Sequence, residues 1–326
     1  MLVISDSDVA KLLPVGEAIG LVRDAFAAYS RGEVICPQRL PLPLLPQGAV
    51  LLSMPAFDGR TYAGVKLVAV QPENARRDLP VVRASYLLFE AQTCELLALL
   101  AATKLTAIRT GAAGGVAADL LALQDASTLA IIGAGAQAET QLLAAVAVRP
   151  IRDAWVYSIE PKLTAAFVAR MAGCVPGTLL HEAASSAEAL AHAAIVVTAT
   201  TAAEPVFDDT DLAPGAHITA VGAFTPAMQE VPDATMARAR VYVDADEAAW
   251  GEAGDLLGPL ARGAIRRDHA VGEIGALVDG RIPGRTSEQQ ITLFKSVGLA
   301  AQDLVCAATV YERAREAGVG QHASLG

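Results

Sequence analysis

The stretch "TLAIIGAGAQAETQLLAAV", residues 128–146, determines the fold expected for this chain. It begins as an apolar run typical of a buried strand, breaks at two glycines, and continues with apolar residues at helical spacing. The glycines belong to a G-x-G-x-x-A pattern, residues 133–138, between the expected strand and the expected helix. In that context the pattern predicts a turn that binds a dinucleotide, although an α/β protein without nucleotide can carry a similar turn.

Each residue of this turn has a predicted role. Gly133 permits the tight turn, Gly135 lets a pyrophosphate approach the backbone, and Ala138 lets the helix pack closely on the strand. Ala136 and Gln137 open the helix, whose free N–H groups and positive dipole attract phosphate. We therefore expect these five residues to bind the cofactor.

Strand-like and Ala-rich helical segments alternate from residue 127 onward. Strands are expected in "TLAIIG", "DAWVYS", "AAIVVTAT", "HITAVG" and "RVYVDAD", which predicts an α/β fold with a doubly wound parallel sheet. Residues 1–115 instead predict an α+β domain with a helix at "PVGEAIGLVRDAFAAYSRG" and antiparallel strands in "QRLPLPLL", "AVLLSMPA", "YAGVKLVAV" and "ASYLLFEAQTCELLALL". After residue 284, "RTSEQQITLFKSVGLAAQDLVCAATVYERAREAG" predicts one long helix that returns to the first domain.

Composition narrows the function classes. The 326 residues favour two domains, and the formal charge of −10 disfavours nucleic acid as a partner. No membrane span is expected, because no run of about twenty apolar residues is uninterrupted. The N-terminus lacks the pattern of a signal peptide. The four cysteines are far apart without C-x-x-C spacing, which fits a cytoplasmic protein and gives no metal motif.

Three cations stand in otherwise apolar segments: Arg39 in "CPQRLPLP", Lys66 in "YAGVKLVAV" and Arg109 in "LTAIRTGAAGG". A buried cation is unfavourable by several kcal/mol unless it is paired, and these segments contain no neighbouring acid. An external anion such as a substrate carboxylate is therefore a predicted partner. A snorkelling side chain or a distant salt bridge is the alternative for each residue alone.

Several blocks along the chain together resemble the ornithine cyclodeaminase and mu-crystallin family. They are "LLSMPAFDG", "GVKLV", "LPVVRASYLLFEAQTCELLALL", "LTAIRTGAA", "IIGAGAQA", "TATTAAEPVF", "AVGAFTPAMQEV", "EAGD" and "GRTSEQQITLFKSVGLAAQDL". The resemblance implies a Rossmann domain, residues 116–299, inserted into a substrate-binding and dimerisation domain, residues 1–115 plus 300–326. It also implies a homodimer.

The resemblance assigns site residues as well. Arg39, Lys66 and Arg109 match the family's contacts to the substrate carboxylate and imine, and we expect them to be catalytic. Met54 and Phe224 are expected to form an apolar wall around the substrate. Further cofactor contacts are expected at Thr110, Thr200, Val221, Gly222, Lys295 and Ser296, the last two at the end of the inserted domain's last helix.

Two departures from the family pattern indicate which chemistry to expect. The cyclodeaminases carry an aspartate where this chain has Phe224, and a glutamate that aligns with Leu52. Without these carboxylates the proton transfers of cyclodeamination lack their acid and base groups. The resemblance is instead to ketimine reductases, which reduce Δ1-pyrroline-2-carboxylate or Δ1-piperideine-2-carboxylate to proline or pipecolate. The alternatives are an alanine dehydrogenase-like enzyme, ornithine cyclodeaminase activity, or non-catalytic NADP(H) and ligand binding of the mu-crystallin type.

Cofactor choice depends on the end of the second parallel strand, in "VYSIEPK". An acid there would bind the ribose of NADH and an arginine would bind the 2′-phosphate of NADPH. The chain has Ser158 and Ile159 instead, with Glu160 two residues late. Because Ser158 and Lys162 could together accept a phosphate, we expect NADPH to be used, with NADH possible.

Overall fold

The computed structural model describes residues 1–45, 48–77 and 79–324. Contacts within the chain divide it into two compact units, Met1–Arg109 with Leu299–Gly326, and Thr110–Gly298. The first boundary lies inside helix α3 (Thr103–Leu121), so residues 110–115 belong to the second unit. A domain boundary is recognised in a sequence by the composition of a loop, and a boundary that falls within a helix has no such composition.

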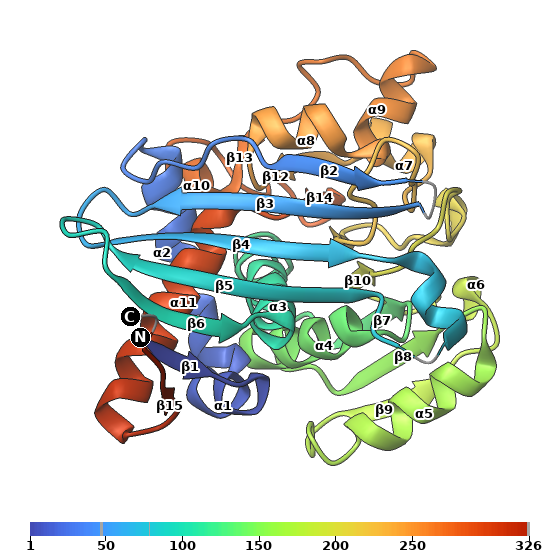
Figure 1. Cartoon of the computed structure of the whole chain (residues 1–326). Helices are drawn as coiled ribbons and strands as arrows, with labels where there is room; N and C mark the ends of the chain where they lie inside the picture. The colour runs from blue at the N-terminus through green and yellow to red at the C-terminus, as the bar shows by residue number, and fades with distance from the viewer. Residues whose placement is uncertain (46–47, 78, 325–326) are drawn as a thin grey trace. The chain divides into compact units, whose positions relative to one another are not determined.

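The first unit contains one seven-stranded sheet in the order β15-β1-β6-β5-β4-β3-β2 (Figure 1). Its strands are β1 (Leu2–Ile4), β2 (Leu40–Leu44), β3 (Ala49–Phe57), β4 (Tyr62–Val70), β5 (Val82–Glu90), β6 (Leu96–Ala101) and β15 (Gln321–His322). Its helical segments are α1 (Asp6–Leu12), α2 (Val15–Ser30), the 3-10 helix η1 (Pro72–Arg77), the start of α3, and α11 (Ala300–Ala317). Strands β2 to β6 are antiparallel, as predicted.

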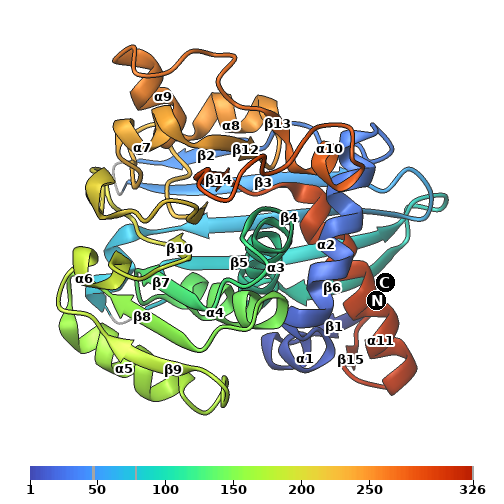
Figure 2. The same cartoon turned by 180° about the vertical axis from the view of Figure 1, so that it is seen from behind.

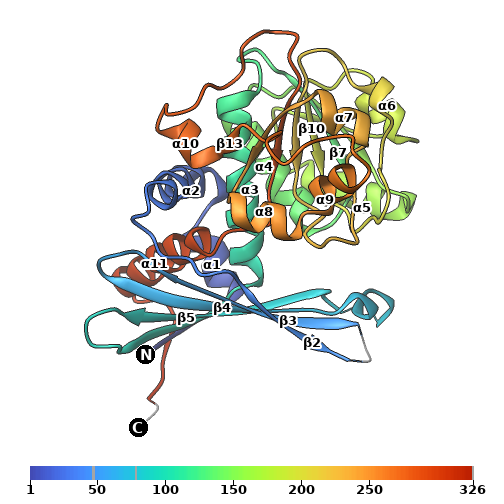
Figure 3. The same ribbon diagram turned by 90° about the horizontal axis from the view of Figure 1, so that it is seen from above.

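The long strands alternate between two faces of this sheet. Met54, Lys66, Tyr86 and Leu100 are cross-strand partners in one row, and all four side chains are buried. Helices α11 and α1 lie on one face of the sheet, and in the described part of the unit no helix lies on the other face (Figure 3). The buried row therefore faces α11, which contacts β3, β4 and β5.

The second unit contains an eight-stranded sheet in the order β13-β12-β14-β11-β10-β7-β8-β9. The strands are β7 (Thr128–Ile132), β8 (Asp153–Tyr157), β9 (Leu179–Glu182), β10 (Ile195–Thr198), β11 (His217–Ala220), β12 (Arg240–Val243), β13 (Gly272–Glu273) and β14 (Thr292–Lys295). All of its pairings are parallel. The strand order reverses between β7 and β10, which confirms the predicted doubly wound α/β fold.

Helices connect these parallel strands, as a crossover requires. They are α4 (Ala136–Val148), α5 (Pro161–Met171), α6 (Ser186–Leu190), the 3-10 helix η2 (Asp209–Asp211), α7 (Asp233–Arg238), α8 (Asp246–Glu252), α9 (Gly254–Ala261) and α10 (Ile274–Val278). Figure 2 shows α5 beside β9 at one edge of this unit. No helix in the described ranges has the length and apolar character needed to cross a bilayer.

One predicted element is wrong. The segment after residue 284 was expected to form a single helix, but residues 292–295 form strand β14 and the helix begins only at Ala300. Thr292, Leu293 and Phe294 are fully buried between β11 and β12, and a continuous apolar run in a central parallel strand lacks the alternation that would distinguish it from a buried helix.

Candidate functional site

The glycine turn has the geometry expected of a phosphate-binding turn. Gly133 has φ +111°, and a Cβ on it would lie 2.5 Å from the carbonyl oxygen of Ala199. Gly135 is different, because nothing lies within 4 Å of the position where its Cβ would stand. Ala138 is fully buried in the helix–strand contact. The structure thus has a required glycine at the turn and open space beside Gly135.

The helix that follows this turn begins without a side-chain cap. Gly135 is the N-cap of α4, and no side chain accepts a hydrogen bond from the first turn. Ala136 is exposed beside it. Uncapped N–H groups and the helix dipole attract an anion at this point. A dinucleotide pyrophosphate fits the turn, which lies at the strand-order reversal where doubly wound folds bind dinucleotides.

The other expected cofactor residues of this unit also lie at strand ends. Thr200 follows β10, and Val221 and Gly222 follow β11. All three are partly exposed. Since parallel strands end at one edge of the sheet, these residues share the carboxyl-terminal edge with Gly133. Thr110 instead lies on α3, where its carbonyl oxygen accepts a hydrogen bond from Gln141 Nε2 at 2.9 Å.

Lys295 is the last residue of β14 and Ser296 follows it, and both side chains contact internal partners. Lys295 is fully buried, and its Nζ lies 2.8 Å from Asp255 Oδ2. Ser296 Oγ donates a hydrogen bond to Asp244 Oδ2 at 2.7 Å. Both side chains therefore have partners within the protein, and a contact of either residue with the cofactor stays a prediction.

The segment after β8 is open to solvent. Ser158 is half-buried, and its Oγ accepts a hydrogen bond from the Glu160 backbone N–H at 3.3 Å. Ile159 is 86% exposed, and Lys162 is exposed in the first turn of α5. The segment presents neither an inward acid nor an arginine.

The first unit brings two of the predicted cations together on a buried carboxylate. Asp303 of α11 accepts hydrogen bonds from Lys66 Nζ at 2.9 Å on Oδ1 and 2.8 Å on Oδ2. Arg109 Nε donates to Asp303 Oδ1 at 3.1 Å, and Arg109 also donates to Gln302 Oε1 at 2.9 Å. We call these four residues, Lys66, Arg109, Gln302 and Asp303, the buried charge cluster.

Asp303 gives Lys66 and Arg109 the distant salt bridge that the sequence left open as the alternative to an external anion. It lies 237 residues from Lys66 in the sequence, so the segments around the cations give no sign of it. While Lys66 is protonated, two cations share one carboxylate, so the cluster has an excess of positive charge. The Arg39 guanidinium also acts on Lys66 and disfavours its protonated form.

The environment of Lys66 changes its protonation. Burial lowers the pKa of Lys66 to about 7, and the nearby Arg109 and Arg39 guanidinium groups act in the same direction. Asp303 opposes them by stabilising the ammonium form. Lys66 therefore gains or loses its proton close to neutral pH, as a general acid or base requires.

Apolar residues surround this cluster on the sheet. Met54 pairs directly with Lys66 across β3 and β4 and is 3% exposed. Leu52 is buried two residues earlier on the same face, so the position aligned with the family glutamate has no carboxylate. In the second unit Phe224 is partly buried and packs against that unit's apolar core.

Several buried polar residues were missed from the sequence. Asp303 stands in "LAAQDLVC", an acid in an apolar helical face, which is the same signal that identified the cations. Tyr86 lies next to Lys66 across β4 and β5, and its buried hydroxyl has no hydrogen-bond partner among the residues that the structure describes. Glu230, Asp244 and Asp255 have fixed partners at the edge of the parallel sheet.

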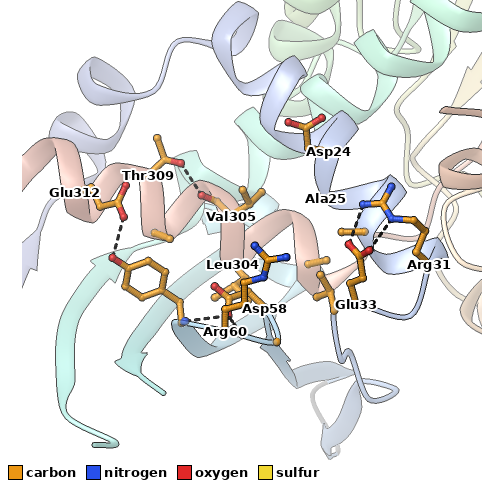
Figure 4. A pocket seen from close by; sticks show the side chains of 16 residues that line it. Asp24, Ala25, Arg31, Glu33, Asp58, Arg60, Leu304, Val305, Thr309 and Glu312 are labelled. Carbon is orange, nitrogen blue, oxygen red and sulfur yellow. Dashed lines mark hydrogen bonds and ion pairs between the residues drawn. The ribbon is translucent and has the colours of Figure 1, made fainter. Parts of the chain in front are cut away.

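The first unit also has an open groove of about 760 Å³ beside α11 and the end of α2 (Figure 4). Its charged side chains bind one another: Arg31 pairs with Glu33, and Tyr62 donates to Glu312. Asp58 accepts three backbone N–H groups of its own turn. None of the predicted substrate residues lines this groove, so we do not assign the substrate to it.

Known proteins resemble the chain over its whole length. A Δ1-pyrroline-2-carboxylate reductase of Bacillus cereus (strain ZK / E33L) is 39% identical over 98% of this chain and 99% of its own. The solved structure of the Thermococcus litoralis Δ1-pyrroline-2-carboxylate reductase in complex with NADH and L-proline matches with a TM-score of 0.96. It is 38% identical in sequence, and the match covers 99% of this chain and 100% of the chain of that reductase.

An archaeal alanine dehydrogenase dimer with bound NAD is also similar. It matches with a TM-score of 0.94 and 33% identity over 100% of this chain and 99% of its own. The sequence profile described as the ornithine cyclodeaminase/mu-crystallin family matches residues 1–318. The chain therefore belongs to the ornithine cyclodeaminase/mu-crystallin family.

Proposed function

We propose that this protein reduces a cyclic imine-2-carboxylate, Δ1-pyrroline-2-carboxylate or Δ1-piperideine-2-carboxylate, to L-proline or L-pipecolate with a reduced nicotinamide dinucleotide. The observation that carries the proposal is the buried charge cluster, in which Lys66 and Arg109 share the single carboxylate of Asp303. An added carboxylate would balance the remaining positive charge. The similarity to reductases of this substrate class supports the same conclusion.

The residues of the chain perform two tasks in this reaction. Arg109 and Arg39 bind the substrate carboxylate, because guanidinium groups form paired hydrogen bonds with carboxylates. Lys66 donates its ammonium proton to the imine nitrogen, and the resulting iminium carbon accepts a hydride and its two electrons. A bound NADH or NADPH supplies that hydride. Lys66 then recovers a proton from water.

The missing acids argue against cyclodeamination. That reaction removes a hydride from an amine, closes a ring and releases ammonia, and it needs carboxylates to move protons. Leu52 and Phe224 supply none. Imine reduction needs only one proton and one hydride, which the proposed roles of Lys66 and the cofactor account for.

An assay with purified protein tests the proposal. We expect oxidation of NADH or NADPH with each cyclic imine-2-carboxylate and negligible ammonia release from ornithine. Turnover of pyruvate that depends on ammonia would favour the alanine dehydrogenase reaction, which the relative from Archaeoglobus fulgidus makes the second candidate. Cofactor binding without turnover of any of these substrates would contradict an enzymatic function.

Cofactor preference is the finer part of the proposal. Similar structures hold NADH or NAD, and we propose that this chain uses NADPH as well as NADH. Ser158 and Lys162 can accept a 2′-phosphate, and Glu160, the acid after β8, is exposed and opposes NADPH only if it turns inward. A cytoplasmic location remains a prediction.

We further propose that the protein is a homodimer that covers the open face of the seven-stranded sheet. Pro55, Val65, Leu87 and Leu99 are cross-strand partners on that face, and an uncovered apolar sheet face favours association. The similar alanine dehydrogenase is a dimer. A mass of twice 33.6 kDa by light scattering, reduced to that of one chain by Leu87→Asp, is the expected result; a single-chain mass for the unaltered protein would contradict it.

A further inference from the structure

Glu230 connects two loops at the carboxyl-terminal edge of the parallel sheet. Its Oε1 accepts hydrogen bonds from Thr200 N at 2.6 Å and Thr200 Oγ1 at 2.9 Å. Its Oε2 accepts hydrogen bonds from Gly222 N at 2.8 Å and Ala223 N at 3.0 Å. The loops after β10 and β11 are therefore held together by one fully buried carboxylate.

The position of Glu230 is itself fixed by a second carboxylate. Asp255 Oδ1 accepts hydrogen bonds from the backbone N–H groups of Glu230 at 2.7 Å and Val231 at 2.9 Å. Asp255 Oδ2 lies 2.8 Å from Lys295 Nζ. Burial raises the pKa of Glu230, and the charge of Asp255 acts in the same direction, whereas Lys295 and the donors of Thr200 act to lower it. The pKa of Glu230 stays above its ordinary value, and the hydrogen bonds it accepts are the contacts that favour its ionised form.

A carboxylate suits this position better than other polar side chains. All four contacts are donors, and an ionised carboxylate accepts hydrogen bonds at both oxygens without donating any. An amide would turn an NH₂ group toward two of those donors. The two loops approach so closely that a Cβ on Gly222 would contact both the Thr200 carbonyl oxygen and the Glu230 carboxylate.

The loops after β10 and β11 are separated by the strand-order reversal from the end of β8, where the adenine half of a dinucleotide is expected. In a doubly wound fold the pyrophosphate lies at the first turn, here Gly133–Gly135, and the second strand, β8, ends at the adenosine ribose. The nicotinamide half then lies across the reversal point, over the ends of β10 and β11. Thr200 and Gly222 are the residues at those ends.

We propose that Glu230 is a positioning residue for the nicotinamide half of the cofactor, because it fixes the loops after β10 and β11 before the cofactor binds. The proposal rests on the dinucleotide site proposed above. It assigns to Glu230 no contact with the cofactor. Its effect passes through the backbone of Thr200, Gly222 and Ala223.

Binding measurements with two probes test this role. We expect Glu230→Gln to weaken NADH binding about tenfold or more, since buried donors would lose a charged acceptor. ADP, which lacks the nicotinamide half, should bind the variant with unchanged affinity. Asp208→Asn serves as the control, because it removes one carboxylate from an exposed turn of the same unit and should leave both affinities unchanged. Calorimetry measures each dissociation constant.

The possible results separate the proposals. Unchanged NADH affinity in Glu230→Gln, or equal losses for NADH and ADP, would overturn the positioning role. Wild-type protein that binds neither probe would instead refute the dinucleotide site. If Glu230→Gln fails to fold, amide hydrogen exchange of the cofactor-free wild-type protein decides. Slow exchange at residues 200, 222 and 223 supports the proposal, and fast exchange that slows only with NADH contradicts it.

Discussion

The buried charge cluster of the first unit and the glycine turn of the second are both proposed anion sites, but they are built from different parts of the chain. The cluster uses side-chain charges that are withdrawn from water and need an internal carboxylate, Asp303, to be stable. The turn instead offers the backbone N–H groups at the start of α4 and the open space beside Gly135. The buried charge cluster is charged before a ligand binds, whereas the glycine turn has only the dipole of helix α4.

This difference determines how each site should respond to mutation. A side-chain site loses affinity when one charge is removed, and its protonation depends on every neighbouring charge. A backbone site is insensitive to removed charges but sensitive to added volume, because a ligand must occupy the space next to the chain.

The largest effect is expected from Gly135→Val. Gly135 has φ −90°, an ordinary value for any residue, and its Cβ position is open, so the variant should fold with an unchanged melting temperature. The added side chain fills the space the pyrophosphate needs, and NADH affinity should fall by about 100-fold or more. Calorimetry with NADH measures this loss.

Gly177→Val provides a matched control, because its Cβ also meets nothing within 4 Å but it lies before β9, away from the turn. Its NADH affinity should equal that of the wild type. Retained NADH binding by folded Gly135→Val would mean that the turn does not hold the pyrophosphate.

Loss of one arginine proposed to bind the substrate carboxylate should have the next largest effect. Arg109→Ala or Arg39→Ala should reduce kcat/KM for the imine about tenfold to a hundredfold, since a hydrogen bond to a charged group contributes about 1.5 to 3 kcal/mol. NADH affinity should not change, because no residue of the turn is altered. Steady-state kinetics at saturating cofactor measures the loss.

Arg170→Ala is the comparison variant, since Arg170 forms an ion pair that is about half exposed and is outside both sites. Normal imine kinetics in Arg109→Ala or Arg39→Ala would remove that residue from the carboxylate site.

The same contrast explains what the sequence could predict. The turn is a contiguous pattern whose residues are adjacent in the chain, so both its fold and its open glycine could be foreseen from residues 128–146. The cluster joins Lys66 and Arg109 to Asp303 across long sequence separations. Local sequence identified the cations as unusual but gave no sign of their shared partner.

The errors have a similar cause. Strand β14 was assigned to a helix because a central parallel strand is apolar on both sides and shows no alternation. The resemblance placed Lys295 at the end of a helix, whereas it is the last residue of β14 and its partner Asp255 comes from another segment. Glu230 was not identified at all, since its four donors lie in loops whose contact only the tertiary structure creates.

A smaller effect is expected on the pH dependence of kcat/KM for the imine, which the pKa of Lys66 determines. The pKa of Lys66 is lowered to about 7 despite the opposing effect of Asp303. Asp303→Asn removes the stabilising carboxylate, so the pKa of Lys66 should fall further, by about one unit. If protonated Lys66 is the proton donor, kcat/KM for the imine declines above the Lys66 pKa, and the decline should begin at lower pH in the variant.

Titration of the Lys66 ammonium by ¹⁵N NMR gives the same quantity without turnover. The contrary outcome is a Lys66 titration that shifts in Asp303→Asn while kcat/KM declines at the same pH as in the wild type. That result would show that Lys66 binds the carboxylate but does not donate the proton.

The smallest effect concerns the choice between NADPH and NADH. Ser158 stands where an acid would bind the ribose 2′-hydroxyl, and Glu160 follows two residues later and is exposed, so discrimination against NADPH should be weak. Ser158 and the exposed Lys162 can offer a hydrogen bond and a point charge, but Ile159 stands where an arginine would bind the phosphate through two hydrogen bonds. We therefore expect kcat/KM values for the two cofactors that differ by less than about tenfold, or 1.4 kcal/mol.

Lys162→Ala sharpens this expectation, because it should lower kcat/KM with NADPH while leaving NADH unchanged. The backbone turn is common to both cofactors, so a loss with both would place Lys162 outside the phosphate contact. A preference for NADH greater than about tenfold in the wild type would indicate that Glu160 binds the ribose. The cofactor site would then include a negatively charged side chain. It would differ from the buried charge cluster in the sign of its charge as well as in its use of backbone groups.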